Sequence, residues 1–423
     1  MQIGRRTLLH TFALVAALVG VTGVAARAQH STPRNPSVTE DDHLRVWLLT
    51  AGPGDEVWER FGHNALRVLD TRAGRDVSYN WGIFDFRQAD FISRFLQGRM
   101  LYQMAPFDTD AMVDLYARAN REVVQQELDL TPEQKRELYA LAEINALPEN
   151  RGYIYQYFLD NCSTRIRDLL DQVLDGGLSE AFAGILNHRS YRDHSRRLTQ
   201  MDPLIFTGQD FLLGAPTDAA LSVWEEMFLP LTLRDELRGL TIRGDTGRPR
   251  PFVLTEEVLV AADRPGEPET PPRWLFIYLT LGLILGGALS GVGRTRGRYS
   301  AWLHRSLVTV AVTWSLVGGG LGSVLVLLLF TDHTFSYWNE NLFLFNPLML
   351  VLGVLLPFTG LGSRWEARAR GLAIALAGIA VVGLLWQLAP ASRHQNAIFF
   401  ALALPVHLGL AGGLSVFRDK NQR

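Results

Sequence analysis

Cys162 is the only cysteine in the 423-residue chain, so no disulfide can form within one chain. It follows Asp160 and Asn161, and either residue can cap a helix whose first turn then holds the thiol. The free backbone N–H groups of a first turn stabilise a thiolate, and Arg165 and Arg167 are expected to act in the same direction. These residues therefore predict a nucleophilic cysteine.

The same pattern also suits a buried structural thiol. Four apolar side chains follow Cys162 on one helical face, and they are Ile166, Leu169, Leu170 and Val173. Free cysteines are among the most buried residues in proteins. From this pattern alone, core packing and catalysis are equally good interpretations of Cys162.

A thiol nucleophile needs a base, and His63 is the best candidate in the first half of the chain. It stands at the start of an expected strand, directly after a turn that contains Gly62. A strand end beside a helix N-terminus brings base and nucleophile together in papain-like enzymes. Asn80, one strand further on, is expected to orient the imidazole, and Asn64 and Tyr79 are the alternatives.

Other chemistries find less support in the sequence. His188 and His194 fall in an arginine-rich stretch, residues 187–197, which we interpret as a solvated surface. No metal-binding motif is present, so neither a metal nor another cofactor is expected. The net charge of −2 gives no polyanion-binding signature, and nucleic acid is therefore not an expected partner.

Short strands flanked by helices are expected around these residues, which predicts an α+β domain. The expected strands cover residues 44–50, 64–69, 77–81 and 122–128. The expected helices cover residues 88–97, 108–120 and 131–146, and a further helix begins near Asn161. No motif is recognised between residues 178 and 252.

Four motifs in this order resemble one family, and they lie at residues 62–67, 79–86, 150–153 and 160–168. They resemble the periplasmic domain of the Lnb-type bacterial proteins linked to lipoprotein N-acylation, over about residues 44–174. The order of His63 before Cys162 is also similar to the permuted NlpC/P60 fold, which includes lecithin:retinol acyltransferase-like enzymes. The resemblance implies a papain-like domain in which Cys162 carries an acyl chain as a thioester. Asn161, Ser163 and Arg165 would support that site.

Hydrophobic residues make up 48% of the chain and charged residues 20%, and the two kinds are separated along it. Beyond Trp274, five apolar segments approach the roughly 20 residues that cross a bilayer as a helix. They cover residues 274–292, 306–330, 342–361, 371–388 and 397–417. Arginines crowd the first and third loops and the C-terminal tail, which the positive-inside rule assigns to the cytoplasm. The region before Trp274 and the loop 331–341 are therefore expected to face the periplasm together.

The expected organisation begins with a secretory signal or N-terminal anchor at residues 1–28, because Arg5 and Arg6 precede a short apolar stretch and an Ala-Arg-Ala site. A periplasmic cysteine-enzyme-like domain (29–263) and a Pro-rich linker (264–273) follow. Five transmembrane helices (274–417) and a cytoplasmic tail (418–423) complete the chain. This organisation predicts a multi-pass protein of the bacterial inner membrane.

The loop 331–341 combines aromatic residues with a polar cluster. Tyr and Trp residues suit the membrane interface, but they do not account for the polar side chains beside them. His333, Asn339 and Asn341 are therefore candidates for a site that docks a lipid headgroup or a substrate.

The leading hypothesis is a membrane-bound acyltransferase that acts on lipoproteins. Cys162 would attack an ester carbonyl of a phospholipid while His63 takes the thiol proton, and the N-terminal amine of a lipoprotein would then receive the acyl chain. Backbone N–H groups at Cys162 and Ser163 are the expected oxyanion donors. A cell-wall peptidase or amidase of the NlpC/P60 type is the first alternative. A non-enzymatic envelope scaffold, in which Cys162 is inert and buried, is the second.

A lipid donor constrains where the thiol can work. Each CH₂ group exposed to water costs about 0.8 kcal/mol, so a sixteen-carbon chain costs on the order of 12 kcal/mol. The linker 264–272 spans about 28 Å when it is fully extended. We therefore expect the face that carries Cys162 and His63 to lie near the loop that holds His333 and Asn341.

Overall fold

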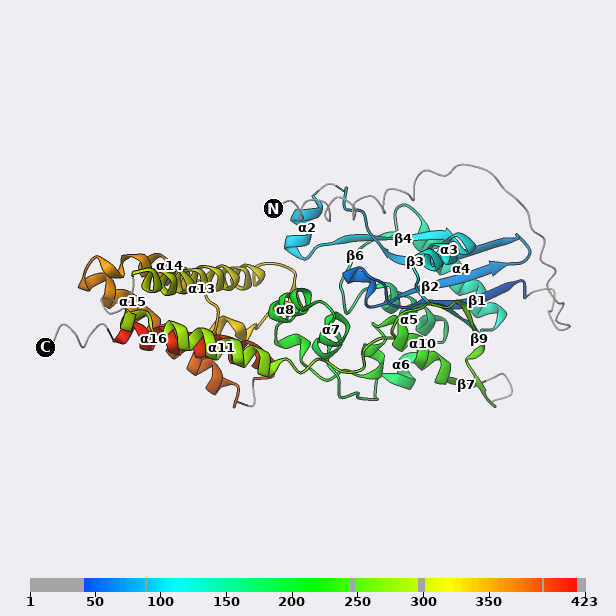
Figure 1. Cartoon of the computed structure of the whole chain (residues 1–423). Helices are drawn as coiled ribbons and strands as arrows, with labels where there is room; N and C mark the ends of the chain where they lie inside the picture. The colour runs from blue at the N-terminus through cyan, green and yellow to red at the C-terminus, as the bar shows by residue number, and fades with distance from the viewer. Residues whose placement is uncertain (1–41, 89, 244–247, 296–300, 390–391, 417–423) are drawn as a thin grey trace. The chain divides into compact units, whose positions relative to one another are not determined.

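The computed structural model describes residues 42–88, 90–243, 248–295, 301–389 and 392–416 (Figure 1). The expected signal or anchor and the expected C-terminal tail lie outside the described residues, as do Arg296 and Arg298 of the first basic loop.

An antiparallel sheet of seven strands forms the centre of the first half, in the order β6-β4-β3-β2-β1-β5-β9. Its strands are β1 (Leu44–Ala51), β2 (His63–Asp70), β3 (Arg75–Ile83), β4 (Leu101–Asp108), β5 (Val123–Leu128), β6 (Gly152–Ile154) and β9 (Val253–Val260). Two further strands, β7 (Thr241–Arg243) and β8 (Pro249–Pro251), pair with each other. The four expected strands are confirmed, whereas β4, β6 and β9 were not expected.

Helices surround this sheet, so the α+β expectation is confirmed. They are α2 (Phe91–Gln97), α3 (Thr109–Arg118), α4 (Pro132–Ala146), α5 (Cys162–Val173), α6 (Gly177–Phe182), α7 (Tyr191–Thr199), α8 (Pro203–Leu212), α9 (Val223–Glu226) and α10 (Pro230–Gly239). Short 3₁₀ helices are η2 (Val57–Glu59) and η3 (Ala215–Thr217). Helix α4 begins where local chemistry predicts, because Thr131 and Gln134 form a capping box and Pro132 is the first helical residue.

The sheet is buried on both faces, and successive residues of β1 show this. Leu48 packs into the main core with residues of α4, α5 and α10, whereas Leu49 packs with Met112 of α3 on the opposite face. Side chains alternate between the two faces of a strand, so each face receives its own layer of helices. The start of α5 is thereby held against the sheet.

Helix α7 corrects the interpretation of residues 187–197 as a solvated surface. Arg192 is completely buried, with its Nη1 atom 2.8 Å from Asp210 Oδ1 and its Nε atom 2.6 Å from Asp218 Oδ1. His194 is buried as well, and its Nε2 atom lies 2.6 Å from Glu226 Oε1. The prediction was wrong for α7, because the partners that neutralise these charges are supplied by segments that showed no motif, whereas His188 is exposed as predicted.

The expected linker is not a free spacer along its whole length. Arg264 donates from Nε to the carbonyl oxygen of Asn120 at 2.7 Å. Glu267 accepts from Arg197 Nη1 at 2.7 Å, and both of these side chains are largely buried. These contacts fix the first part of the linker against the sheet domain, so its reach is shorter than that of an extended chain.

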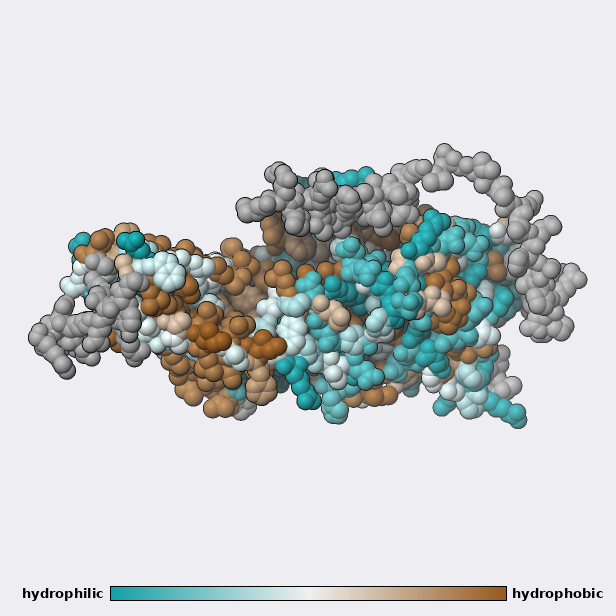
Figure 2. Space-filling view, in the orientation of Figure 1, coloured by the Kyte–Doolittle hydropathy of each residue, from teal (hydrophilic) through white to brown (hydrophobic). Residues whose placement is uncertain are grey.

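The second half is helical. Among the described residues, four segments are long and apolar enough to cross a membrane: α13 (Ala301–Leu328), Glu340–Thr359, α15 (Ser363–Trp386) and α16 (Ala397–Ser415). The second of these comprises η5 (Glu340–Phe343), α14 (Leu348–Leu355) and part of η6 (Leu356–Gly360). Hydrophobic colour gathers over these helices in Figure 2, and hydrophilic colour over the sheet domain.

The first expected span differs from the other four. It forms α11 (Leu275–Leu289), which has only 15 residues, and the short helix α12 (Val292–Thr295) follows it. Helix α11 packs closely on α16, because a Cβ atom at Gly286 would lie 2.2 Å from the carbonyl oxygen of Pro405. Such contacts require glycine, as in tightly packed membrane helices. The structure thus supports four spans by length and leaves the fifth unconfirmed.

Candidate active site

Cys162 is the first residue of α5, as the sequence predicts. The Asn161 side chain caps the helix, since its Oδ1 atom accepts from the N–H groups of Ser163 at 2.8 Å and Thr164 at 3.0 Å. The Asn161 amide also donates to the carbonyl oxygens of Tyr157 and Phe228, each at 2.9 Å. These bonds fix the helix start, and the Cys162 side chain is only 9% exposed there.

His63 is the first residue of β2, and its backbone pairs with Ala51 of β1. The preceding Gly62 has φ of +78°, and a Cβ atom on it would lie 3.0 Å from the carbonyl oxygen of Ala51. Glycine is therefore required at the turn that leads into His63. The His63 Nε2 atom lies 2.9 Å from the Oδ1 atom of Asn80, which is buried on the neighbouring strand β3.

The Cys162 thiol and the His63 imidazole lie close enough to interact electrostatically, and each shifts the pKa of the other. Burial raises the pKa of the Cys162 thiol, but the His63 imidazolium and N–H groups of Asn64 and Ser163 outweigh it, so the pKa is lowered. Burial likewise lowers the pKa of His63, but the Cys162 thiolate and the bond to Asn80 leave it raised. A buried thiolate is costly without a cation. The pair is therefore suited to a thiolate–imidazolium state.

Asn64 and Ser163, two further residues that the sequence singled out, connect strand β2 to helix α5. The Asn64 Nδ2 atom donates to Ser163 Oγ at 3.1 Å, and Ser163 Oγ donates to the carbonyl oxygen of Met227 at 2.6 Å. Thr50 donates to Asn64 Oδ1 at 2.8 Å. Asn64 therefore positions β2 against α5 rather than contacting the imidazole.

Tyr79, the other alternative partner of His63, points elsewhere. Its hydroxyl donates to Glu143 of α4, and burial together with that carboxylate raises the pKa of Tyr79. Of the three candidates, the structure brings only Asn80 to the imidazole.

The arginines that follow Cys162 have partners of their own. Arg165 donates from Nη2 to Asp160 Oδ2 at 2.6 Å and covers the ring of Tyr153 at 4.3 Å. Arg167 donates to Asp168 at 2.8 Å and stacks on Trp224 at 3.9 Å. His63, and not an arginine, is the cation that lowers the thiol pKa.

Gly82 is a site residue that the sequence did not reveal. It has φ of +91° and lies where the pairing of β3 with β4 shifts register between Asn80 and Ile83. A Cβ atom on it would lie 3.9 Å from Cys162 Cβ and 3.6 Å from Tyr155 Cε2. Such irregularities often occur beside active sites. The glycine stands inside the motif 79–86, but its position near the thiol depends on strand pairing.

Tyr116 and Arg121 approach His63 from another side. The rings of Tyr116 and His63 have centroids 6.5 Å apart, and Arg121 lies over the Tyr116 ring at 4.8 Å. Burial raises the pKa of Tyr116 to about 12, so its hydroxyl stays protonated at neutral pH. Arg121 opposes protonation of His63, although its own charge is paired with Glu59 at 3.2 Å.

The three candidate residues of the loop 331–341 contact the sheet domain. Asn339 donates to the carbonyl oxygen of Phe211 at 2.9 Å, and Asn341 donates to the same oxygen at 3.0 Å. His333 bonds through Nε2 to the carbonyl oxygen of Phe95 at 2.8 Å. These bonds attach the loop to helices α2 and α8 of the first half of the chain.

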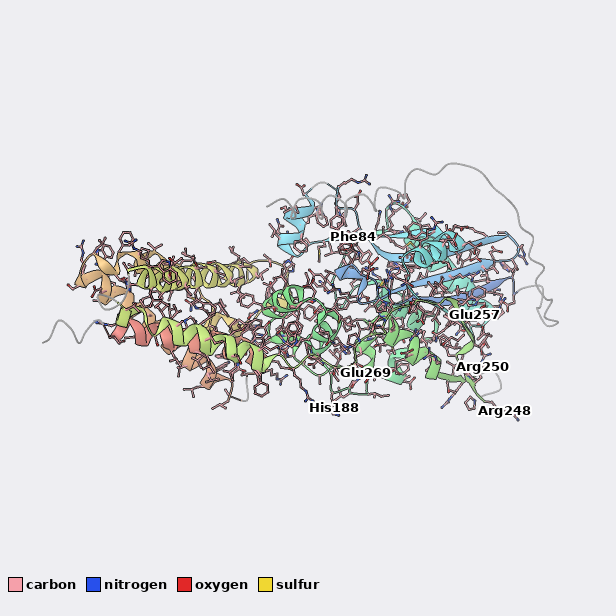
Figure 3. The ribbon with its side chains drawn as sticks, in the orientation of Figure 1. Phe84, His188, Arg248, Arg250, Glu257 and Glu269 are labelled. Carbon is pink, nitrogen blue, oxygen red and sulfur yellow. The ribbon has the colours of Figure 1, made fainter. Side chains whose placement is uncertain are left out.

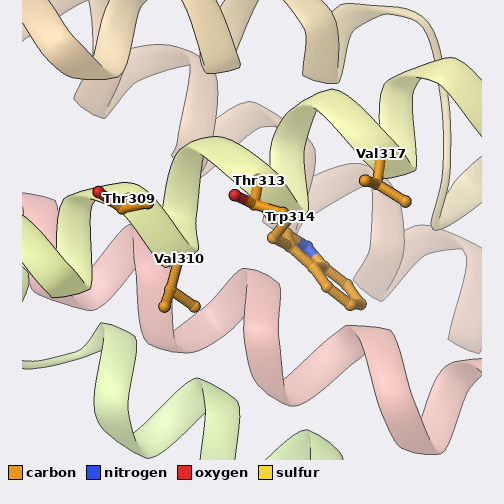
Figure 4. Close-up of a pocket in the computed structure, with 5 residues that line it drawn as sticks. All are labelled: Thr309, Val310, Thr313, Trp314 and Val317. Carbon is orange, nitrogen blue, oxygen red and sulfur yellow. The ribbon is translucent and has the colours of Figure 1, made fainter. Parts of the chain in front are cut away.

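Two other features lie apart from Cys162. A hollow of about 300 Å³ is lined by Thr309, Val310, Thr313, Trp314 and Val317, all on the membrane helix α13 (Figure 4). His188 is exposed, and Figure 3 shows it at the edge of the sheet domain. In the part of the chain that the structure describes, no group of three or more His, Cys, Asp or Glu side chains could hold a metal ion.

The fold and this site define a membrane protein with a Cys–His–Asn constellation in a sheet-containing domain. Residues 38–197 match the family model of the Lnb N-terminal periplasmic domain, so the resemblance predicted from the four motifs is confirmed over this part of the chain. No curated protein and no solved structure matches the chain.

Proposed function

We propose that this protein is a membrane-bound cysteine acyltransferase that moves an acyl chain from a phospholipid to the N-terminal amine of bacterial lipoproteins. The placement of Cys162 at the start of α5, beside the His63 that Asn80 orients, carries the proposal, because the imidazole lowers the pKa of the buried thiol. The similarity to the Lnb N-terminal periplasmic domain supports an enzyme of lipoprotein processing.

The proposal includes a location and a fold. The protein would reside in the bacterial inner membrane, with the sheet domain in the periplasm and with α11 and α12 together as a fifth crossing. The order of His63 on a strand before Cys162 at a helix start supports a papain-like domain of the permuted NlpC/P60 type. The contacts between the loop 331–341 and the domain support a working position at the membrane surface.

The first half-reaction forms a thioester. The Cys162 thiolate attacks the ester carbonyl of the phospholipid, and the tetrahedral oxyanion collapses with loss of the lysophospholipid alkoxide. The His63 imidazolium gives this leaving group its proton, so a neutral alcohol departs and His63 becomes neutral. The backbone N–H groups of Asn64 and Ser163 near the sulfur support stabilisation of the oxyanion, which would share the Ser163 N–H with Asn161 Oδ1.

The second half-reaction transfers the chain to nitrogen. The lipoprotein amine attacks the thioester carbonyl, neutral His63 takes one amine proton, and the C–S bond breaks to regenerate the thiolate–imidazolium pair. The products are an amide and the starting enzyme. Asn80 keeps the imidazole oriented through both steps, because it bonds Nε2 and leaves Nδ1 to carry the proton.

Full-length protein in phospholipid vesicles, supplied with a diacylated lipoprotein peptide, tests the proposal. Mass spectrometry should find an N-acylated peptide and a hydroxylamine-sensitive acyl group on Cys162. The nearly isosteric variant Cys162→Ser should form neither, while its thermal unfolding stays close to that of the wild type. Ser195→Ala, a buried hydroxyl on α7, is a matched control that keeps the thiol.

Two outcomes would replace the proposal. Full transfer activity in Cys162→Ser would rule out the thiol as nucleophile and favour a scaffold in which Cys162 is inert. Cleavage of cell-wall peptides by the wild type, without peptide acylation, would favour the peptidase or amidase.

A further inference from the structure

A row of aromatic rings leads away from the site. Successive ring centroids are 4.3 Å apart for Tyr155 and Tyr102, 5.0 Å for Tyr102 and Phe84, 4.8 Å for Phe84 and Phe86, and 5.1 Å for Phe86 and Phe91. We call these five residues the ring row. They come from the segment after β3, from α2, and from β4 and the segment after β6. Tertiary structure therefore assembles the ring row from separate parts of the chain.

One end of the ring row lies beside the nucleophile. Gly82 separates Tyr155 from Cys162, and a Cβ atom on this glycine would touch both side chains, at 3.6 Å and 3.9 Å. A side chain at position 82 would therefore stand between the thiol and the first ring. Glycine at this position therefore leaves free the volume that a side chain would take beside Tyr155 and Cys162.

The other end lies at helix α2, which has no buried residue. Ile92 is 66% exposed, Leu96 62% and Phe95 46%, so a contiguous apolar surface faces outward. Soluble domains rarely leave such a surface to water, and it commonly marks a binding or membrane-contact site.

Helix α2 is fixed to the membrane half by several bonds. The Asp332 N–H donates to the carbonyl oxygen of Gln97 at 2.8 Å, and Arg99 donates to Asp332 Oδ2 at 2.6 Å. His333 bonds the carbonyl oxygen of Phe95. Helix α13, which is long and apolar enough to cross a membrane, ends at Leu328, only a few residues before Asp332, so these bonds hold α2 close to the end of that segment.

We propose that the ring row and the exposed face of α2 form an acyl-chain path, along which a fatty acyl chain of a lipid in the adjoining leaflet reaches Cys162. This inference rests on the proposed function, which supplies the reaction at Cys162. It adds the surface that binds the acyl chain of the phospholipid donor. The exposed face of α2 contacts the acyl chains of the leaflet. The stacked rings cover the donor's acyl chain between the leaflet and the Cys162 thiol. Phe84, labelled in Figure 3, lies in the middle of the path.

A photoactivatable lipid locates the path without requiring catalysis. Full-length protein is reconstituted with a phosphatidylethanolamine that carries a diazirine at the end of one acyl chain, then illuminated and digested. We expect labelled peptides from residues 84–102 in addition to those from the membrane helices. Leu254, which is 54% exposed on the opposite edge strand β9, provides the control peptide and should remain unlabelled. Labelling confined to the membrane helices would overturn the proposal.

Variants test whether the path serves the long chain specifically. Phe86→Ser and Leu96→Ser should slow acylation of Cys162 by a palmitoyl phospholipid by about tenfold or more, as expected for lost apolar contacts with a substrate. Acetylation by p-nitrophenyl acetate and alkylation by iodoacetamide should change less than about twofold in the same variants. Leu254→Ser should change none of these rates. A parallel loss of long-chain and acetyl reactions would instead indicate a damaged site and overturn the path.

The two proposals fail in different ways. If wild-type protein forms no thioester with either donor but the lipid probe labels residues 84–102, the proposed reaction fails and the acyl-chain path stands. If the thioester forms and the probe leaves these residues unlabelled, the reaction stands and the path fails.

Discussion

The Nε2 atom of His63 lies 2.9 Å from the Oδ1 atom of Asn80, on the strand paired with its own. The nitrogen of the same amide fixes its orientation, because Asn80 Nδ2 donates to the carbonyl oxygen of Ser78 at 2.9 Å. An amide oxygen can only accept, so Nε2 of His63 must carry a proton. Nδ1 is therefore the ring nitrogen left to exchange a proton with Cys162 in the proposed reaction.

The first prediction concerns the pH dependence of Cys162 alkylation. His63 lowers the thiol pKa in the wild type, so iodoacetamide should already react at pH values below the ordinary thiol pKa. In His63→Ala only the N–H groups of Asn64 and Ser163 still oppose burial, so the thiol pKa rises, and each unit of increase above pH 7 lowers the thiolate fraction at pH 7 about tenfold. The midpoint of the rate–pH curve should therefore move to higher pH. His188→Ala, which removes an exposed imidazole, should keep the wild-type curve, and coincident curves for His63→Ala would contradict the assigned base.

The second prediction concerns the orientation of the imidazole. Asn80→Ala removes one hydrogen bond to His63, and a bond of about 1 kcal/mol corresponds to about fivefold in rate. The acyl-transfer rate should fall by at least this factor, and the thiol pKa should rise because the bond to Asn80 helps to keep His63 protonated. Asn145→Ala, which removes a bond to a backbone carbonyl on α4, is the control. An unchanged alkylation profile in Asn80→Ala would show that the amide is only structural.

The third prediction concerns the buried charges of α7. Arg192→Ala leaves Asp218 buried without its guanidinium, and breaking such a pair costs about 3–5 kcal/mol. Asp210 loses less, because Arg196 still donates to it at 2.9 Å. The variant should unfold at a clearly lower urea concentration when full-length protein is followed by tryptophan fluorescence in micelles. Arg118→Ala, which breaks an exposed pair, should change stability by less than about 0.5 kcal/mol; equal midpoints for the two variants would contradict the prediction.

Local chemistry made part of this protein predictable from its sequence. Asn161 caps a helix at Cys162 and Gly62 turns the chain into His63, because these effects depend only on neighbouring residues. The membrane helices were also predictable, since bilayer thickness sets the length of an apolar segment. Helix α11 shows the limit of that rule, because its 15 residues are fewer than a membrane span needs. Its packing on α16 was not predictable either, since it involves glycines whose partners lie far along the chain.

Only the tertiary structure decided which polar residue contacts His63. Asn64 follows His63 directly, and Tyr79 and Asn80 stand on the next strand, but side chains alternate between the faces of a strand and pairing sets the register. Asn64 consequently contacts Ser163 and Tyr79 contacts Glu143, while Asn80 reaches the ring. The ring row from Tyr155 to Phe91 and the buried partners of Arg192 were hidden for the same reason. Each joins residues from distant parts of the chain, and only folding brings these parts within contact distance.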